Sequence, residues 1–157
     1  MKVNRLLFLF FIFISFFDCT AISEENKLNK ISDPKQVCVQ LLTFNKLEKD
    51  AVISRRQAYK KFNEDQKVPG GGDLESIRTA SQRVEWITIR QEEIFDQLLK
   101  MAGMPNVDKN RRILNGFDST KDQREISFRS LIIEGGIVAE TFCKGYGVEI
   151  WDYRQVQ

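Results

Sequence analysis

Residues 73–103, DLESIRTASQRVEWITIRQEEIFDQLLKMAG, decide the fold of this chain. Apolar residues recur there at the three- and four-residue spacing of one helix face. Seven of the eight stripe positions are apolar, namely Ile77, Ala80, Val84, Ile87, Ile94, Leu98 and Met101, and the eighth is Gln91. Asp73 is placed to cap the first turn and Gly103 to end the last one. The stretch therefore predicts one long amphipathic helix, with Gln91 as the polar interruption of its buried face.

A second long helix is expected before it. Asp33 and Pro34 have the chemistry of an N-cap and a first helical residue, and no Gly or Pro follows until Pro69. Glu48 and Arg55 interrupt an otherwise apolar stripe, which consists of Val37, Leu41, Phe44, Ala51, Ala58 and Phe62. The glycine run after Pro69 ends the segment. The pattern predicts a helix that is either continuous or broken once.

The last predicted helix runs from Asp118 or Ser119 to about Lys144. One face carries Phe128, Leu131, Gly135, Val138 and Phe142, and Ile126, Ile133 and Ile137 lie beside it. Because this helix is apolar on more than one side, we expect it to lie centrally in the fold. The pair Gly135-Gly136 indicates either a close approach of another backbone or a kink.

Two shorter segments complete the prediction. The connector 104–118 contains Pro105 and Gly116, with room for one or two helical turns at 109–114, and residues 148–153 alternate like a strand that straps the helices. The predicted fold class is all-α, an up-and-down helical bundle of three to four helices with a short extended C-terminal tail. Residues 33–157 are expected to form a single helical domain.

The first 23 residues are typical of an export signal. Lys2 and Arg5 precede an apolar run from Leu6 to Phe17, and small or polar residues follow. We expect cleavage after Ala21 or Ser23 and a flexible leader over residues 24–32. The apolar run is shorter than the ~20 residues that cross a bilayer, so no stable membrane span is expected in the mature chain. The predicted location is secreted or periplasmic.

The predicted location bears on whether the cysteines form a disulfide. Cleavage removes Cys19 and leaves Cys38 and Cys143, which an oxidising compartment favours as a disulfide. Two buried free thiols are the alternative. Three long helices running up, down and up would place the two about 40 Å apart, whereas bonded cysteines need Cα atoms within about 7 Å. Either the first helix folds back near residues 45–50, or the connector runs the length of the bundle. We prefer the second, because the connector contains the helix breakers.

Composition excludes several classes of site. The chain has no histidine, and its 24 basic and 22 acidic residues leave a formal charge of +2. The absence of histidine excludes Ser-His-Asp catalysis and histidine metal sites, and the near balance of charge gives no indication of nucleic-acid binding. We expect no cofactor and no metal. Two basic clusters are interpreted as solvated faces, with a patch for an anionic partner as the alternative: Arg55, Arg56, Lys60 and Lys61, and then Lys109, Arg111 and Arg112.

Trp86 is the residue most typical of a partner contact. It lies one residue off the apolar stripe, beside Arg83, Arg90 and Glu93, and an aromatic ring rimmed by charge has the composition of a binding hot spot. Burial between helices is the alternative. Trp151 and Tyr153 in the tail carry the same two interpretations.

A pattern around Trp86 resembles the core of the LprI-type lysozyme-inhibitor family, which are small secreted helical proteins of the bacterial envelope. The pattern spans residues 38–95 and consists of Asp50, Tyr59-Lys60-Lys61, Gln82-Arg83 and Trp86-Ile87-x-x-Arg90-x-x-Glu93. It has one more residue between Gln-Arg and Trp than the family, and lacks the cysteine expected after the arginine. The placement of one cysteine in the first helix and one in the last is also similar to that of some periplasmic immunity proteins that block secreted amidases.

The function predicted from these features is a non-enzymatic helical binding protein, an inhibitor or immunity factor against an enzyme of the cell envelope. Two alternatives stay open. Glu134-Gly135-Gly136 resembles the Glu-Gly-Gly of some lysozyme-like muramidases, so a carboxylate-dependent wall hydrolase would use Glu134. The other alternative is a helical carrier of apolar ligands.

Overall fold

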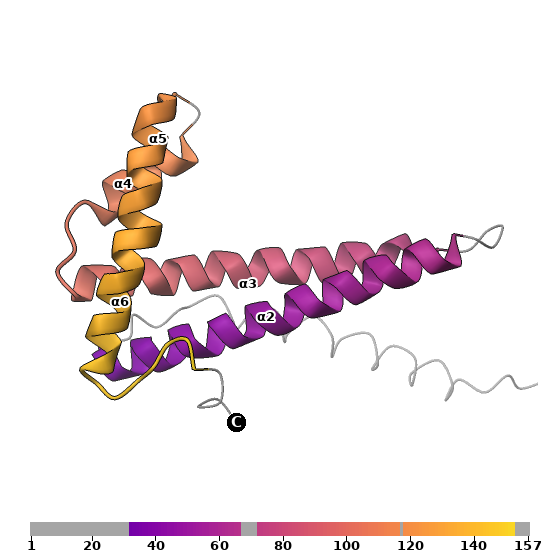
Figure 1. Ribbon diagram of the computed structural model, residues 1–157, viewed down its shortest axis with the longest axis horizontal. Helices are drawn as coiled ribbons and strands as arrows, with labels where there is room; N and C mark the ends of the chain where they lie inside the picture. Colours follow the sequence, from indigo (N-terminus) through magenta and orange to yellow (C-terminus); the bar gives the residue numbers. More distant parts are fainter. Residues whose placement is uncertain (1–31, 67–71, 117, 153–157) are drawn as a thin grey trace, which may run out of the picture. The chain divides into compact units, whose positions relative to one another are not determined.

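The computed structural model describes residues 32–66, 72–116 and 118–152. The expected signal, the leader up to residue 31 and Tyr153 lie outside these ranges. The chain divides after Ile31, and all described residues belong to the part that begins at Ser32. Within it the fold is all-α, and none of the described residues forms a strand (Figure 1). No described helix is long and apolar enough to cross a membrane.

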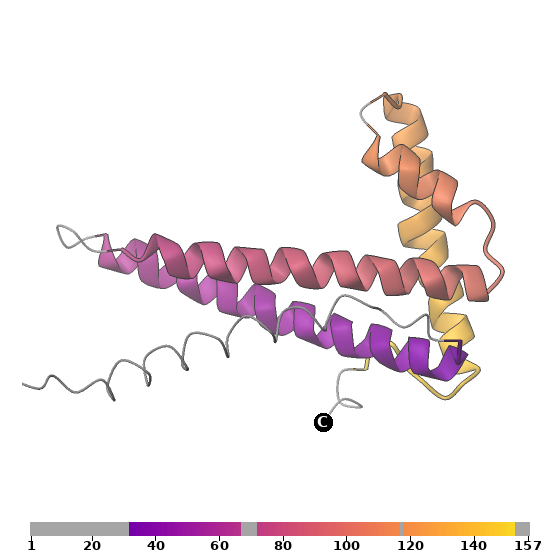
Figure 2. The ribbon, with the colours of Figure 1, turned by 180° about the vertical axis from the view of Figure 1, so that it is seen from behind.

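Two long helices form an antiparallel hairpin. They are α2, Pro34–Asp65, and α3, Leu74–Met101 (Figures 1 and 2). The predicted caps are confirmed: Asp33 Oδ1 accepts a hydrogen bond from the Lys35 backbone N–H at 3.0 Å, and Asp73 Oδ1 accepts one from Glu75 N–H at 3.0 Å. Helix α2 is continuous, so the break considered near residues 45–50 is not present.

The predicted stripe of α3 forms the core of this hairpin. Five of its eight residues are buried, namely Ile77, Val84, Ile87, Ile94 and Leu98, and Leu99, which is not on the stripe, is buried as well. The buried residues of α2 are Val37, Cys38, Leu41, Leu42, Asn45 and Ala51, and Ala51 packs with Val84 and Ile87 of α3. Gly103 ends the helix as expected, because its φ of +76° is a left-handed conformation that glycine adopts without strain.

Beyond the hairpin, the chain turns away and then returns. Helix α4 covers Val107–Asn115, and α5, Lys121–Phe128, begins at a capping box between Thr120 and Gln123. A π-helical turn, η1 (Arg129–Glu134), joins α5 to α6 (Gly135–Lys144), so that Lys121 to Lys144 is one uninterrupted helix. Figures 1 and 2 show this last helix crossing the hairpin at a steep angle, with α4 packed beside its first half.

The π-turn sets which side of the last helix is buried. The buried residues are spaced four apart: Ser127, Leu131, Gly135, Ala139 and Cys143. In a regular α-helix each four-residue step advances by about 40° around the axis, so this series would wind off the contact face. A π-turn closes its hydrogen bond over one more residue than an α-turn. The extra residue turns the series back and keeps it in line.

Two predictions for this helix were therefore wrong. Leu131 and Gly135 lie on the buried face as expected, but Phe128 is exposed. Phe128 was placed on this face on the assumption of an unbroken α-helical repeat, which the π-turn interrupts. The helix is also not central. Only one side packs on the rest of the fold, and Ile126, Ile133 and Ile137 are exposed.

Gly135 lies where the last helix comes closest to α3. A Cβ built on Gly135 would lie 3.0 Å from Leu99 Cδ1 and 3.3 Å from Phe95 Cζ, whereas one on Gly136 would meet nothing within 4 Å. The close approach of another backbone that was expected for this pair is not found. The approaching groups are side chains of α3, not its backbone.

The predicted disulfide between Cys38 and Cys143 is confirmed, with a Cα–Cα distance of 5.6 Å. Neither rearrangement expected from the sequence produces it. The connector holds α4 and does not run along the hairpin. Instead, the last helix is much longer than α4, so on its way back it passes the end of α3 and reaches the start of α2.

The segment after α6 lies against α2, as the strap prediction required. Val148 and Ile150 are buried, and the Asn45 side-chain Nδ2 donates a hydrogen bond of 2.9 Å to the Ile150 carbonyl oxygen. This contact fixes the position of the next residue, Trp151.

Candidate binding cleft

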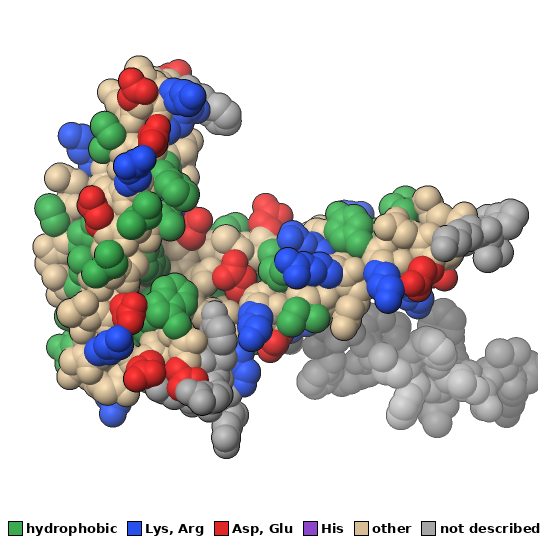
Figure 3. All heavy atoms as spheres, viewed as in Figure 1, with side chains coloured by type: hydrophobic (Ala, Val, Ile, Leu, Met, Phe, Trp, Pro, Cys, Tyr) green, Lys and Arg blue, Asp and Glu red, His purple; other side chains and the backbone are tan. Residues whose placement is uncertain are grey.

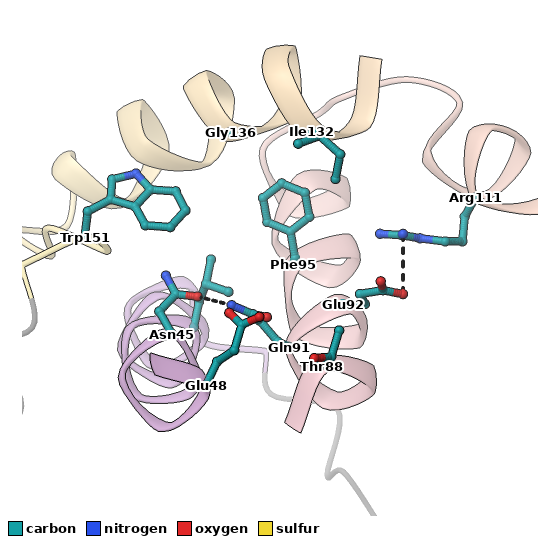
Figure 4. A pocket seen from close by; sticks show the side chains of 11 residues that line it. Asn45, Glu48, Thr88, Gln91, Glu92, Phe95, Arg111, Ile132, Gly136 and Trp151 are labelled. Atoms are coloured by element: carbon teal, nitrogen blue, oxygen red, sulfur yellow. Dashed lines mark hydrogen bonds and ion pairs between the residues drawn. The ribbon is translucent and has the colours of Figure 1, made fainter. Parts of the chain in front are cut away.

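A cleft of about 370 Å³ opens where the last helix crosses the hairpin. Figure 3 shows it as a hollow between these elements, and Figure 4 shows the side chains around it. Every element except α5 contributes to the lining, as does the C-terminal segment. The lining residues are Leu41, Asn45, Glu48, Thr88, Gln91, Glu92, Phe95, Arg111, Ile132, Gly136 and Trp151.

The upper walls of the cleft are apolar. Phe95 projects from α3, Ile132 from the π-turn and Trp151 from the C-terminal segment (Figure 4). Trp151 is 52% exposed although the residue before it is fully buried. Between these side chains, Gly136 presents bare backbone, which keeps the cleft open. The walls thus offer two aromatic rings to an incoming group.

A buried amide pair forms the floor. Asn45 is 2% exposed, and its Oδ1 accepts a hydrogen bond of 2.6 Å from Gln91 Nε2 while its Nδ2 donates to Ile150. A buried amide without such partners would cost about 1–3 kcal/mol. The pair therefore stabilises one arrangement of α2, α3 and the segment that carries Trp151.

An ion-pair group holds α4 against α3 at the far wall. Arg111 donates two hydrogen bonds to Asp96, from Nη2 at 2.8 Å and from Nε at 3.0 Å, and its Nη1 lies 3.4 Å from Glu92 Oε2. The Arg111 side chain is only 16% exposed. Its hydrogen bonds to Asp96 raise the pKa of Arg111 above its usual value. The solvated face predicted for this arginine is therefore wrong, because α3 supplies the carboxylates that partner it.

The charge of the cleft is acidic. Glu48 and Glu92 line it with Arg111, whose two hydrogen bonds go to the third acid, Asp96. Among the residues that the structure describes, Glu48 has no hydrogen bond or ion pair, and it is half-buried. A carboxylate in that setting favours a cationic neighbour.

Trp151 also lines a second, shallower hollow of about 290 Å³. It is also rich in acids, and its lining consists of Glu140, Lys144, Glu149, Ile150, Trp151 and Asp152. Lys144 donates a hydrogen bond of 2.7 Å to Glu140. Trp151 therefore lines two acidic hollows.

The residues expected to contact a partner lie elsewhere. By the α-helical repeat, Trp86, Arg90 and Glu93 share one side of α3, and the cleft residues Thr88, Glu92 and Phe95 share the opposite side. Trp86 is about half exposed, and its ring lies 6.1 Å from that of Phe44. Trp86 is thus partly exposed, as a partner contact would require, and partly packed against α2, as the alternative of burial between helices predicted.

The charged neighbours of Trp86 lie where the sequence placed them. Arg90 Nη1 pairs with Glu93 Oε2 at 2.8 Å, and Arg83 is exposed. Their role as a partner site stays a prediction.

Glu134, the candidate for a wall hydrolase, is exposed on the π-turn and does not line the cleft. No group of three or more His, Cys, Asp or Glu residues suited to a metal occurs in the described ranges.

The polar interruptions of the two stripes were the sequence signal for the cleft. Glu48 breaks the apolar pattern of α2 and Gln91 that of α3, and the structure brings both to the cleft. Asn45 carried no such signal, because nothing local showed that Ile150 would lie next to it. Trp151 was noticed as an ambiguous aromatic residue and forms one wall.

No protein-family model matches this chain, and no curated protein or solved structure is similar enough to indicate a family.

Proposed function

We propose that this chain is an exported, non-enzymatic helical protein that binds a protein partner. The class of partner that we propose is an enzyme acting on the cell envelope, for which this chain is an inhibitor or immunity factor.

The observation that carries the proposal is the exposed apolar surface of the last helix. Ile133 and Ile137 are 55% and 63% exposed and lie about one turn apart, and Ile126, Phe128 and Ile132 are exposed on the same helix. Large apolar side chains gathered on one exposed element are typical of protein interaction sites. Burying one of them fully against a partner stabilises a complex by about 1.5–3 kcal/mol.

Three further features support the proposal. The Cys38–Cys143 disulfide fits an oxidising compartment, in agreement with the export signal expected from residues 1–23. The pattern around Trp86 resembles a family of envelope inhibitors. A hydrogen bond of 3.1 Å from Asn110 Nδ2 to Ser130 Oγ holds the last helix, which carries the exposed side chains, against α4, and such preorganisation lowers the entropic cost of binding.

The test is capture of a partner by the tagged, disulfide-bonded protein from the envelope fraction of its native host. We expect a specific partner, retained by wild type and lost in Ile133→Glu/Ile137→Glu. The matched control is Ile53→Glu/Leu74→Glu, which places the same two charges on exposed apolar residues of α2 and α3. Trp86→Ala and Arg90→Ala determine whether the opposite side of α3 also contributes. Equal capture by wild type and by Ile133→Glu/Ile137→Glu would refute the role of the last helix.

The non-enzymatic part of the proposal has its own test. The purified protein should leave cell-wall polymer intact in a zymogram, and Glu134→Gln should behave like wild type. Hydrolysis by wild type that Glu134→Gln abolishes would overturn it in favour of a carboxylate-dependent hydrolase.

A further inference from the structure

We propose that the cleft binds one basic side chain, an arginine or a lysine, presented by the protein partner. This inference rests on the proposed function and names the chemistry that the partner brings.

The aromatic walls are suited to the stem of such a side chain. In Figure 4 the rings of Trp151 and Phe95 stand on either side of the opening, and Glu48 lies below them on α2. Arginine and lysine carry an apolar stem and a charged head, and the face of an aromatic ring attracts the head as well. The volume of about 370 Å³ is near the lower end of ligand pockets, which suits a single side chain.

The charges of the cleft favour a cation. Glu48 has no partner in the part of the chain that the structure describes, and Glu92 contacts only the third nitrogen of an arginine already bound to Asp96. A guanidinium or ammonium group between Glu48 and Glu92 would gain charge-assisted hydrogen bonds, which are stronger than neutral ones.

An anion would find no equivalent partner. The amide groups of Asn45 and Gln91 already bond to each other and to Ile150, and the Arg111 guanidinium is engaged by Asp96 and Glu92. An anion in the cleft would also lie beside the carboxylates of Glu48 and Glu92, which repel it. The second hollow, with Glu140, Glu149 and Asp152 beside Lys144, extends the same acidic character past Trp151.

The test compares two peptides that differ only in charge. Acetyl-Gly-Arg-Gly-amide and the same peptide with citrulline, a neutral near-isostere of arginine, are titrated into the disulfide-bonded protein, and Kd is read from the NMR shift of the Trp151 indole N–H. We expect the arginine peptide to bind at least about fivefold more tightly. A lysine peptide should also bind more tightly than the citrulline peptide.

Variants locate the binding. Glu48→Gln keeps the shape of the side chain and removes its charge, and Trp151→Ala removes one wall. Each should weaken binding of the arginine peptide about fivefold or more, with Phe95 and Gln91 resonances as the readout for Trp151→Ala. The matched controls are Glu64→Gln at the other end of α2 and Trp86→Ala on the opposite side of α3. Both should change Kd by less than about twofold.

Equal affinity for the two peptides, or no effect of Glu48→Gln and Trp151→Ala, would overturn this inference. Tighter binding of the citrulline peptide would favour a site for neutral ligands and overturn it too. Failure here is distinguishable from failure of the proposed function. A partner captured by wild type, lost in Ile133→Glu/Ile137→Glu and unaffected by Glu48→Gln would leave the proposed function standing while removing the basic side chain.

Discussion

The two adjacent glycines of the last helix allow a sharp test of its packing, because alanine should have opposite effects at the two positions. In a helix interior, Gly→Ala contributes about 1 kcal/mol of stability through the backbone. At Gly136 nothing lies within 4 Å of the added methyl group. We therefore expect Gly136→Ala to raise the free energy of unfolding by about 0.5–1 kcal/mol.

At Gly135 the same backbone gain is opposed by a clash. The methyl group would lie 3.0 Å from Leu99 Cδ1 and 3.3 Å from Phe95 Cζ. Leu99 is fully buried, so its side chain has little room to move aside. Overpacking of this kind costs about 1–3 kcal/mol. We expect Gly135→Ala to lower the free energy of unfolding by about 1 kcal/mol, the difference between the two terms.

The assay is urea unfolding of both variants with the disulfide intact, followed by far-UV circular dichroism. With an m value of about 2 kcal/mol/M, the two midpoints should lie roughly 1 M apart, with wild type between them. A Gly135→Ala variant as stable as Gly136→Ala would refute the close crossing of the last helix over α3.

Three further predictions concern the contacts that hold the crossing in place. Replacing Cys38 and Cys143 by alanine removes a cross-link between residues 105 apart and should lower the free energy of unfolding by about 4–5 kcal/mol, measured by urea unfolding; a loss below about 1 kcal/mol would contradict it. Asn45→Leu leaves the Ile150 carbonyl and Gln91 without their partner and should cost about 1–3 kcal/mol, whereas the exposed substitution Gln57→Leu on the same helix should have little effect; equal effects would contradict the buried pair. The hydrogen bond to Glu140 raises the pKa of Lys144 above its usual value of 10.5. The stabilisation from this hydrogen bond is therefore fully present below pH 10.5 and is lost as the pH rises through the raised pKa of the folded state. NMR titration of Lys144 in Glu140→Gln should return the pKa toward 10.5, and an unchanged pKa would contradict the pairing.

Much of the local structure was predictable because its causes lie within a few residues. Asp33 and Asp73 cap their helices through hydrogen bonds to N–H groups two or three residues away. Gly103 ends α3 through its own backbone conformation. The stripe from Ile77 to Leu98 identified the buried face of α3, and the all-α class followed from these signals together.

The cleft was predictable only in fragments. Glu48 and Gln91 stood out as polar residues at stripe positions, and Trp151 as an aromatic residue in the tail. Nothing in their local sequence showed that they meet, because the contact depends on the path of the last helix. The charged neighbours of Trp86 were easier to identify, since residues three or four apart share a helix face by geometry alone.

The sequence by itself determined the helices, their caps and the pairing of α2 with α3, because spacing and capping act over a few residues. The expected export signal also predicted that Cys38 and Cys143 would pair, and the structure contains this disulfide. Only the tertiary structure decided the phase of the last helix. Its π-turn keeps Leu131, Gly135 and Cys143 on one line, so that Gly135 meets Leu99 while Cys143 reaches Cys38. These are long-range constraints, and they override the α-helical repeat that local sequence would otherwise impose.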